Sequence, residues 1–151
     1  MLPMVALRNK LATLLAADAT TLAPASLANK VQLITAPFAA SENLAIANLT
    51  LASGNGLGAI SCATGTQNTG ADPITSAQII TLIPASGSTF RWLSSGTISP
   101  AITLYGIALT DNGSATLLGV QAFSTPIPIT AAGQVVDVDP VTIKFVLQPM
   151  S

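Results

Sequence analysis

Charged side chains are scarce in this chain, and their scarcity constrains both how it can fold and where it can work. Lysine and arginine together number 5, aspartate and glutamate 6, and histidine 0, so charged residues make up 7% of the 151 residues. An average soluble domain has about 25%. A folded monomer of this mass exposes roughly 7,000 Å² of surface, which leaves about 650 Å² for each charge. We therefore expect much of the outer surface to be covered by other subunits.

The same composition argues against several classes of protein. The five basic residues are scattered and cannot neutralise a row of phosphates, so nucleic acid is not an expected partner. Half of the residues are hydrophobic and the net charge is −1, the opposite of a disordered chain. Every apolar run is interrupted before the roughly 18 to 20 residues that a membrane-spanning helix needs. The sequence predicts a folded chain that does not cross or bind a membrane.

An amphipathic α-helix is predicted at the start of the chain, from about Pro3 to Ala17. Apolar residues recur there at the spacing of one helix face, on which we expect the helix to dock against a core or a neighbouring subunit. The opening residues also resemble a signal peptide, but the apolar stretch is short and apolar residues precede the basic ones, which favours the docking helix. The apolar positions proposed for the contact are Leu7, Leu11 and Leu14.

After this segment, short runs of β-branched residues and leucine are separated by Gly, Pro, Asn and Ser about every ten residues, which is typical of a β-sandwich or barrel. We predict two regions: residues 1–28 as helix and connector, and residues 29–151 as an all-β domain of about eight strands, a two-sheet sandwich or jelly-roll-like fold. The predicted strands are Lys30–Thr35, Leu44–Ala52, Gly58–Ala63, Ser76–Ile83, Ile102–Thr110, Thr116–Phe123, Gln134–Asp137 and Val141–Gln148.

The clearest local feature is a β-hairpin formed by ITLYGIALT, the turn DNGS and ATLLGVQAF. Asn112 and Gly113 are residue types that accept the positive backbone angles of a tight turn, so we expect the turn there. Asp111 is interpreted as a turn residue for the same reason.

Both faces of the hairpin strands are apolar, whereas a half-solvated sheet would be polar on one face. The strands must therefore lie between two layers of this chain or meet another subunit, and the low charge favours the second interpretation. The strands in QIITLIP and AITLYG also lack charged residues that would protect an exposed edge from self-pairing. The interface residues proposed in the β region are Trp92, Tyr105, Ile107 and Leu118.

Candidate catalytic residues are few, because a chain without histidine lacks the usual general base and metal ligand. Asp137 and Asp139 would share one face of a strand, where they could bind a cation, but a solvated strand end is the favoured interpretation. Cys62 is interpreted as a small buried hydrophobic residue. Trp92 could stack on a sugar or anchor an interface, although packing in the core is favoured. We expect no enzymatic activity, bound cofactor or metal ion.

The order of motifs in the second part of the chain resembles a known group of proteins. Phe90 and Trp92 are followed by Pro100, the hairpin ITLYGIALTDNGSATLLGVQAF, then PIPITAAGQVVDVDP and a closing VTIKFVL. Over roughly residues 44–147 this resembles the small β-rich virion structural proteins of tailed bacteriophages. The N-terminal helix is not part of the resemblance.

The resemblance implies a capsid decoration or cement protein, located in the virion after assembly in the bacterial cytoplasm. Its expected partners are the major capsid protein and copies of itself, as a homotrimer. The alternative is a phage tail, adaptor or adsorption-associated β-sandwich that works as a binding module, for which Trp92 and Tyr105 would need to be exposed beside polar groups.

Overall fold

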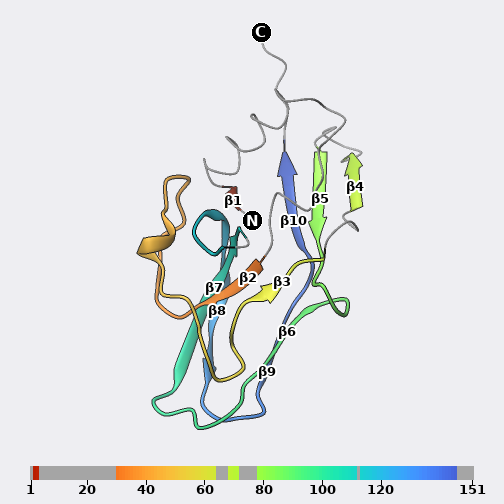
Figure 1. Ribbon diagram of the computed structural model, residues 1–151. Coiled ribbons are helices and arrows are strands. Elements are labelled where there is room, and N and C mark those ends of the chain that lie inside the picture. The colour runs from red at the N-terminus through yellow and green to blue at the C-terminus, as the bar shows by residue number, and fades with distance from the viewer. Residues whose placement is uncertain (1, 4–29, 64–67, 72–77, 112, 146–151) are drawn as a thin grey trace.

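The computed structural model describes residues 2–3, 30–63, 68–71, 78–111 and 113–145. Antiparallel strands dominate these ranges (Figure 1), which confirms the predicted all-β class. The predicted N-terminal helix, with Leu7, Leu11 and Leu14, lies outside the described residues, except that Pro3 belongs to a two-residue strand.

Within the described ranges the strands form three antiparallel sheets. One has five strands in the order β1-β8-β7-β2-β3, one has three in the order β10-β5-β4, and one is the two-stranded ribbon β6-β9. The strands are β1 (Leu2–Pro3), β2 (Lys30–Ile34), β3 (Ile60–Ser61), β4 (Asn68–Ala71), β5 (Gln78–Leu82), β6 (Phe90–Leu93), β7 (Ile102–Thr110), β8 (Leu117–Ile129), β9 (Val135–Val138) and β10 (Val141–Phe145).

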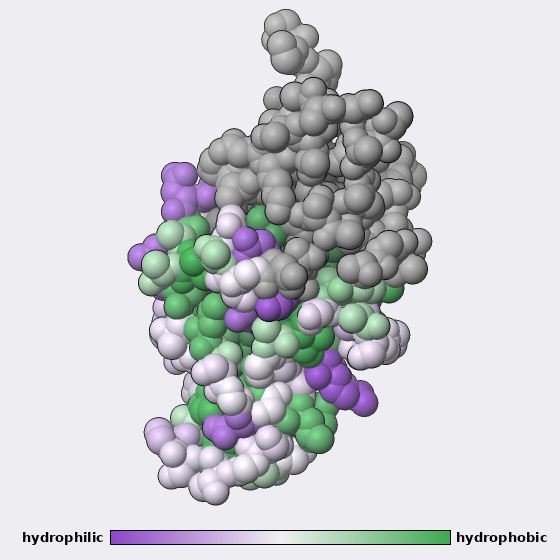
Figure 2. Space-filling model, viewed as in Figure 1, coloured by the Kyte–Doolittle hydropathy of each residue, from purple (hydrophilic) through white to green (hydrophobic). Residues whose placement is uncertain are grey.

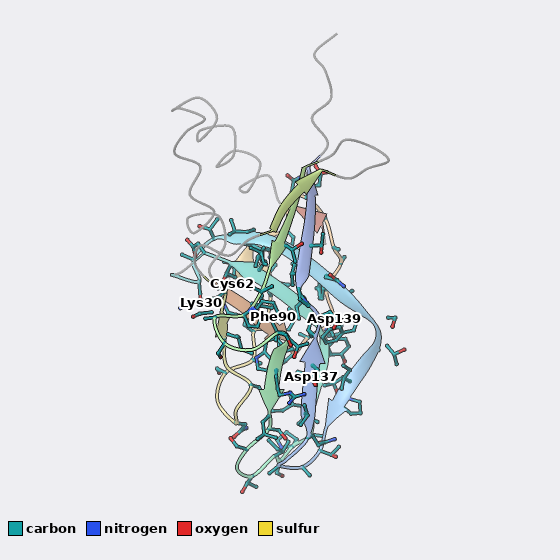
Figure 3. All side chains as sticks on the ribbon, turned by 90° about the vertical axis from the view of Figure 1, so that its right-hand side faces the viewer. Lys30, Cys62, Phe90, Asp137 and Asp139 are labelled. Atoms are coloured by element: carbon teal, nitrogen blue, oxygen red, sulfur yellow. The ribbon has the colours of Figure 1, made fainter. Side chains whose placement is uncertain are left out.

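The predicted hairpin is confirmed: β7 pairs with β8 along its whole length. The register shifts between Leu104 and Gly106, where β7 advances by two residues and β8 by five, and β8 bows outward in Figure 3. The turn is closed by Asp111, whose Oδ1 accepts hydrogen bonds from the backbone N–H groups of Ala115 and Thr116. The expected positive φ is found at Ser114 (54°) and not at Gly113, while residue 112 lies outside the described residues.

One hydrophobic core is shared by the five-stranded sheet and the two smaller sheets. Leu33, Ile107 and Leu118 from the large sheet belong to the same buried cluster as Phe90 and Trp92 of the β6–β9 ribbon. Leu82 and Val141 bring β5 and β10 into this cluster. The ribbon is therefore held to the large sheet by apolar side chains on its inner face.

Part of the second face of the five-stranded sheet is covered by the chain itself. Ile34, Ala108, Leu117 and Val120 form a separate buried cluster, against which partly buried side chains of the segment 35–51 pack. At these positions the favoured interpretation, that a second subunit covers the hairpin, is wrong, because residues between β2 and β3 supply the second layer. The covering side chains are Phe38, Leu44, Ile46, Leu49 and Leu51.

Several strand predictions need correction. The region predicted as a strand over Leu44–Ala52 contains a 3-10 helix at Ile46–Asn48. Its only strand-like feature among the described pairings is an isolated β-bridge between Leu51 and Ile34. The two strands thought to need protection at their edges are interior: β7 lies between β2 and β8, and β5 between β10 and β4. β4 and β6 were not predicted.

Candidate interaction surface

The β6–β9 ribbon presents one buried and one exposed face. Along β6, Phe90 and Trp92 are buried whereas Arg91 and Leu93 are exposed. In β9, Val136 is buried between two exposed residues, Val135 and Asp137. Because side chains alternate along a strand, Arg91, Leu93, Val135 and Asp137 share the outer face, and we call these four residues the ribbon face.

The ribbon face holds an unusual amount of exposed hydrophobic surface. Leu93 is 54% and Val135 52% exposed, and within the described part of the chain they are the exposed large hydrophobic side chains. They are direct partners in the β6–β9 register. Figure 2 shows hydrophobic surface beside a hydrophilic projection at the lower right, the region where Figure 1 draws these strands.

An ion pair occupies the neighbouring rung. Arg91 and Asp137 are also direct register partners, and the guanidinium Nε and Nη2 donate hydrogen bonds of 2.7 Å each to the two carboxylate oxygens. The hydrogen bond from Arg91, with its positive charge, lowers the pKa of Asp137 and raises that of Arg91. The pair is solvent-exposed, so its contribution to folding is small, and its main effect is to fix where the two charges lie.

The structure shows the surroundings of Asp137 and Asp139, the two residues considered for a cation site or a solvated strand end. Both oxygens of Asp137 are engaged by Arg91, and Asp139 is exposed beyond the end of β9. Figure 3 labels the two residues, with Asp139 above Asp137. Among the described residues no group of three or more His, Cys, Asp or Glu gathers as metal ligands would.

The interface residues predicted in the β region lie mostly inside the molecule. Trp92, Ile107 and Leu118 are at most 1% exposed and belong to the main core, so their side chains offer no surface to a partner. Tyr105 is half-buried. The Trp92 indole Nε1 donates a hydrogen bond of 2.7 Å to the Gly58 carbonyl oxygen. This agrees with the core-packing interpretation of Trp92 and leaves no ring face for stacking on a sugar.

Cys62 is a free, buried cysteine, as predicted, and its backbone forms an isolated antiparallel β-bridge with that of Pro84. Desolvation raises the pKa of its thiol to about 11. Because the thiolate is the reactive form, this environment makes Cys62 a poor nucleophile at neutral pH.

Two open depressions adjoin the ribbon. One, of about 550 Å³, is lined by Ile60, Pro84, the loop 86–89 and Arg91. The other, of about 430 Å³, lies between Gln121 and Phe123 of β8 and the segment 137–142. Arg91 and Asp137, which line one depression each, are engaged with each other, so neither charge is left to bind a small ion alone.

The loop before β3 supports the ribbon from its edge. Gly56 has a φ of +74°, and a side chain there would overlap the backbone oxygen of Leu93. The Asn55 carbonyl oxygen accepts a hydrogen bond of 2.8 Å from the Ser95 N–H. These contacts position the end of β6 and therefore the Leu93 side chain.

Sequence reasoning did not single out Leu93 or Val135. The signal was present in the alternation of FRWL and VVDV. In each strand the large apolar residues of one face point to the core, and one charged residue identifies the opposite face as exposed. No helix in the described part of the chain combines the length and hydropathy needed to span a membrane. Comparisons with protein-family models, curated proteins and solved structures give no match to this chain.

Proposed function

We propose that this protein is a two-layer β-sandwich that acts as a structural subunit of a tailed-phage virion, decorating and stabilising the capsid by packing against its neighbours. The observation that carries the proposal is the ribbon face, where Leu93 and Val135 remain about half exposed on a surface with few charges. Exposed apolar groups that form a patch favour contact with another protein.

Charge scarcity supports the same role. Ions buried in an interface must lose their hydration, whereas hydroxyl and amide groups can form hydrogen bonds across it at lower cost. A subunit that is surrounded by neighbours can therefore dispense with most of its charges. The proposed partners are the major capsid protein and further copies of this chain, including a homotrimer.

The alternative role, a tail or adsorption module that binds a ligand through aromatic side chains, is less well supported. Trp92 is buried and hydrogen-bonded within the core. Of the two aromatic residues proposed to bind a ligand, this leaves Tyr105 to support the alternative role.

The test is to delete the gene from the phage that carries it and to compare the two kinds of particle by cryo-electron microscopy. We expect density on the outer capsid lattice that disappears in the deletion, together with earlier rupture of the heads on heating. Density lost from the tail would support the alternative role, and particles with unchanged density would contradict both.

A further inference from the structure

We infer that the ribbon face binds the ribbon face of a second copy of this chain. The two copies are related by a two-fold axis that lies between the two faces, runs parallel to β6 and β9, and passes over the line midway between these strands. This inference specifies one contact of the assembly role proposed above and rests on that role.

The argument begins with the arrangement of the four side chains as two rungs of one ladder. Arg91 of β6 lies opposite Asp137 of β9 in one rung, and Leu93 of β6 lies opposite Val135 of β9 in the next. All four point to the exposed face. The two charges are therefore on different strands but in the same rung, and so are the two hydrophobic side chains. Figure 3 labels Asp137 of β9.

Two copies can place these faces together by two simple rotations. A two-fold axis along the strands exchanges the β6 side with the β9 side but keeps each rung in place. Arg91 then faces Asp137 of the second copy, and Leu93 faces Val135 of the second copy. A two-fold axis across the strands exchanges the rungs instead and puts Arg91 against Leu93, which would desolvate a charge without a partner.

The first rotation therefore satisfies every group on the face. Two arginines and two aspartates alternate in one square, so each carboxylate adjoins two guanidinium groups, and the hydrophobic pairs bury each other beside it. A self-complementary patch of this kind is what a two-fold contact between identical subunits requires. The rotation also leaves the Asp139 carboxylates of the two copies on opposite sides of the axis.

The surroundings of the ribbon allow a close approach. The turns that lead into β6 and β9 are exposed and consist of small uncharged residues, Ser86–Ser88 and Ala131–Gly133. A stable dimer needs roughly 800 Å² buried on each partner, which the four side chains cannot supply alone, so we expect these turns to join the contact around them.

The test uses purified full-length protein and measures its mass in solution by multi-angle light scattering across a concentration series. We expect an even number of 15.2 kDa chains, which is two for a simple dimer and six where the contact joins two of the proposed homotrimers, and we expect Leu93→Asp to halve the assembly mass. The matched control is Ala39→Asp, which adds the same charge at an exposed position on the segment that covers the opposite face of the large sheet. The control should keep the wild-type mass.

A charge exchange makes the test specific for the proposed axis. Arg91→Asp gives a face with two carboxylates and Asp137→Arg gives one with two guanidinium groups, so each variant alone should show half the wild-type mass. Mixing the two should restore it, as should combining both substitutions in one chain. Circular dichroism of each variant establishes that it is folded.

A wild-type protein that remains a monomer at every concentration would overturn the inference, and so would a mixture of the two charge variants that fails to reassociate. Because these measurements use the free protein, they are separate from the particle density that tests the virion role. A dimer without capsid density would keep this contact and reject the decoration role.

Discussion

Replacing Gly56 by alanine tests how the edge of the ribbon is positioned. Two obstacles to a side chain are present at this residue: its φ is +74°, and the backbone carbonyl oxygen of Leu93 lies where the new methyl group would be. Gly54 provides a matched control, since its φ of +72° is nearly the same and nothing lies within 4 Å of a side chain built there. Comparing the two substitutions separates backbone strain from steric overlap.

The expected magnitudes follow from these two terms. A left-handed conformation costs an L-residue about 1–2 kcal/mol, and alanine recovers about 0.4–1 kcal/mol by restricting the unfolded chain. Gly54→Ala should therefore destabilise the fold by about 1 kcal/mol. Gly56→Ala adds an overlap with a backbone atom that cannot rotate away, for which overpacking values of about 1–3 kcal/mol apply.

Thermal and guanidinium unfolding measure this difference. Since 1 kcal/mol corresponds to about 2–4 °C in a domain of this size, an additional 2 kcal/mol predicts a Tm for Gly56→Ala roughly 4–8 °C below that of Gly54→Ala. We also expect Gly56→Ala to weaken self-association, because the end of β6 must move. Equal stability of the two variants would refute the reasoning that the loop at Gly56 packs against Leu93.

Three further predictions test the core, the thiol and the ion pair. Ile107→Ala should lower the free energy of unfolding by about 2–5 kcal/mol in denaturant titrations, whereas the exposed Val135→Ala should change it by less than about 0.5 kcal/mol; equal effects would contradict the assigned burial. With its pKa raised to about 11 from an ordinary 9.0, Cys62 should hold about 100-fold less thiolate at pH 8 than an unperturbed thiol, and fast labelling of the native protein by a disulfide reagent would disprove this. Because Arg91 lowers the pKa of Asp137, the stabilisation from their pair should be present above the ordinary carboxyl pKa of 3.8 and lost as the pH falls through the lowered value. The Tm difference between wild type and Asp137→Asn should accordingly shrink on acidification, and a constant difference down to pH 2 would argue against the pair.

The β7–β8 hairpin could be predicted from the sequence because its information is local. Two apolar runs flank a turn rich in Asp, Asn, Gly and Ser, and the strand bounds of β7 match the prediction, Ile102–Thr110. The position of the positive φ could not be predicted in the same way. Asp111 bonds to two backbone N–H groups across the turn, and this places the left-handed residue at Ser114.

The layer over the second face was missed because it depends on contacts between distant residues. Leu44, Ile46, Leu49 and Leu51 alternate with polar and small residues in a way that also fits a strand, but in the structure these side chains pack onto Ile34, Ala108, Leu117 and Val120. Tertiary packing thus overrides a weak local β preference. The apolar residues on both faces of the hairpin correctly predicted that side chains on both faces are buried. They could not predict which segment supplies the second covering layer.

Charge scarcity leads to a more limited conclusion than the sequence suggested. The chain covers the second face of its hairpin at Ala108, Leu117 and Val120 and pairs both edges of β7 and β5 internally, so these parts of the strands do not need a neighbouring subunit to cover them. What remains is a ribbon face on which hydrophobic and charged side chains occupy separate rungs. Hydrophobic contact is not directional, so a face of Leu93 and Val135 alone would bind in many orientations. Placing Arg91 and Asp137 in the adjoining rung penalises every orientation that leaves a charge against an apolar group. In the proposed dimer of a chain with so few charges, the position of one ion pair would therefore determine how the two copies align.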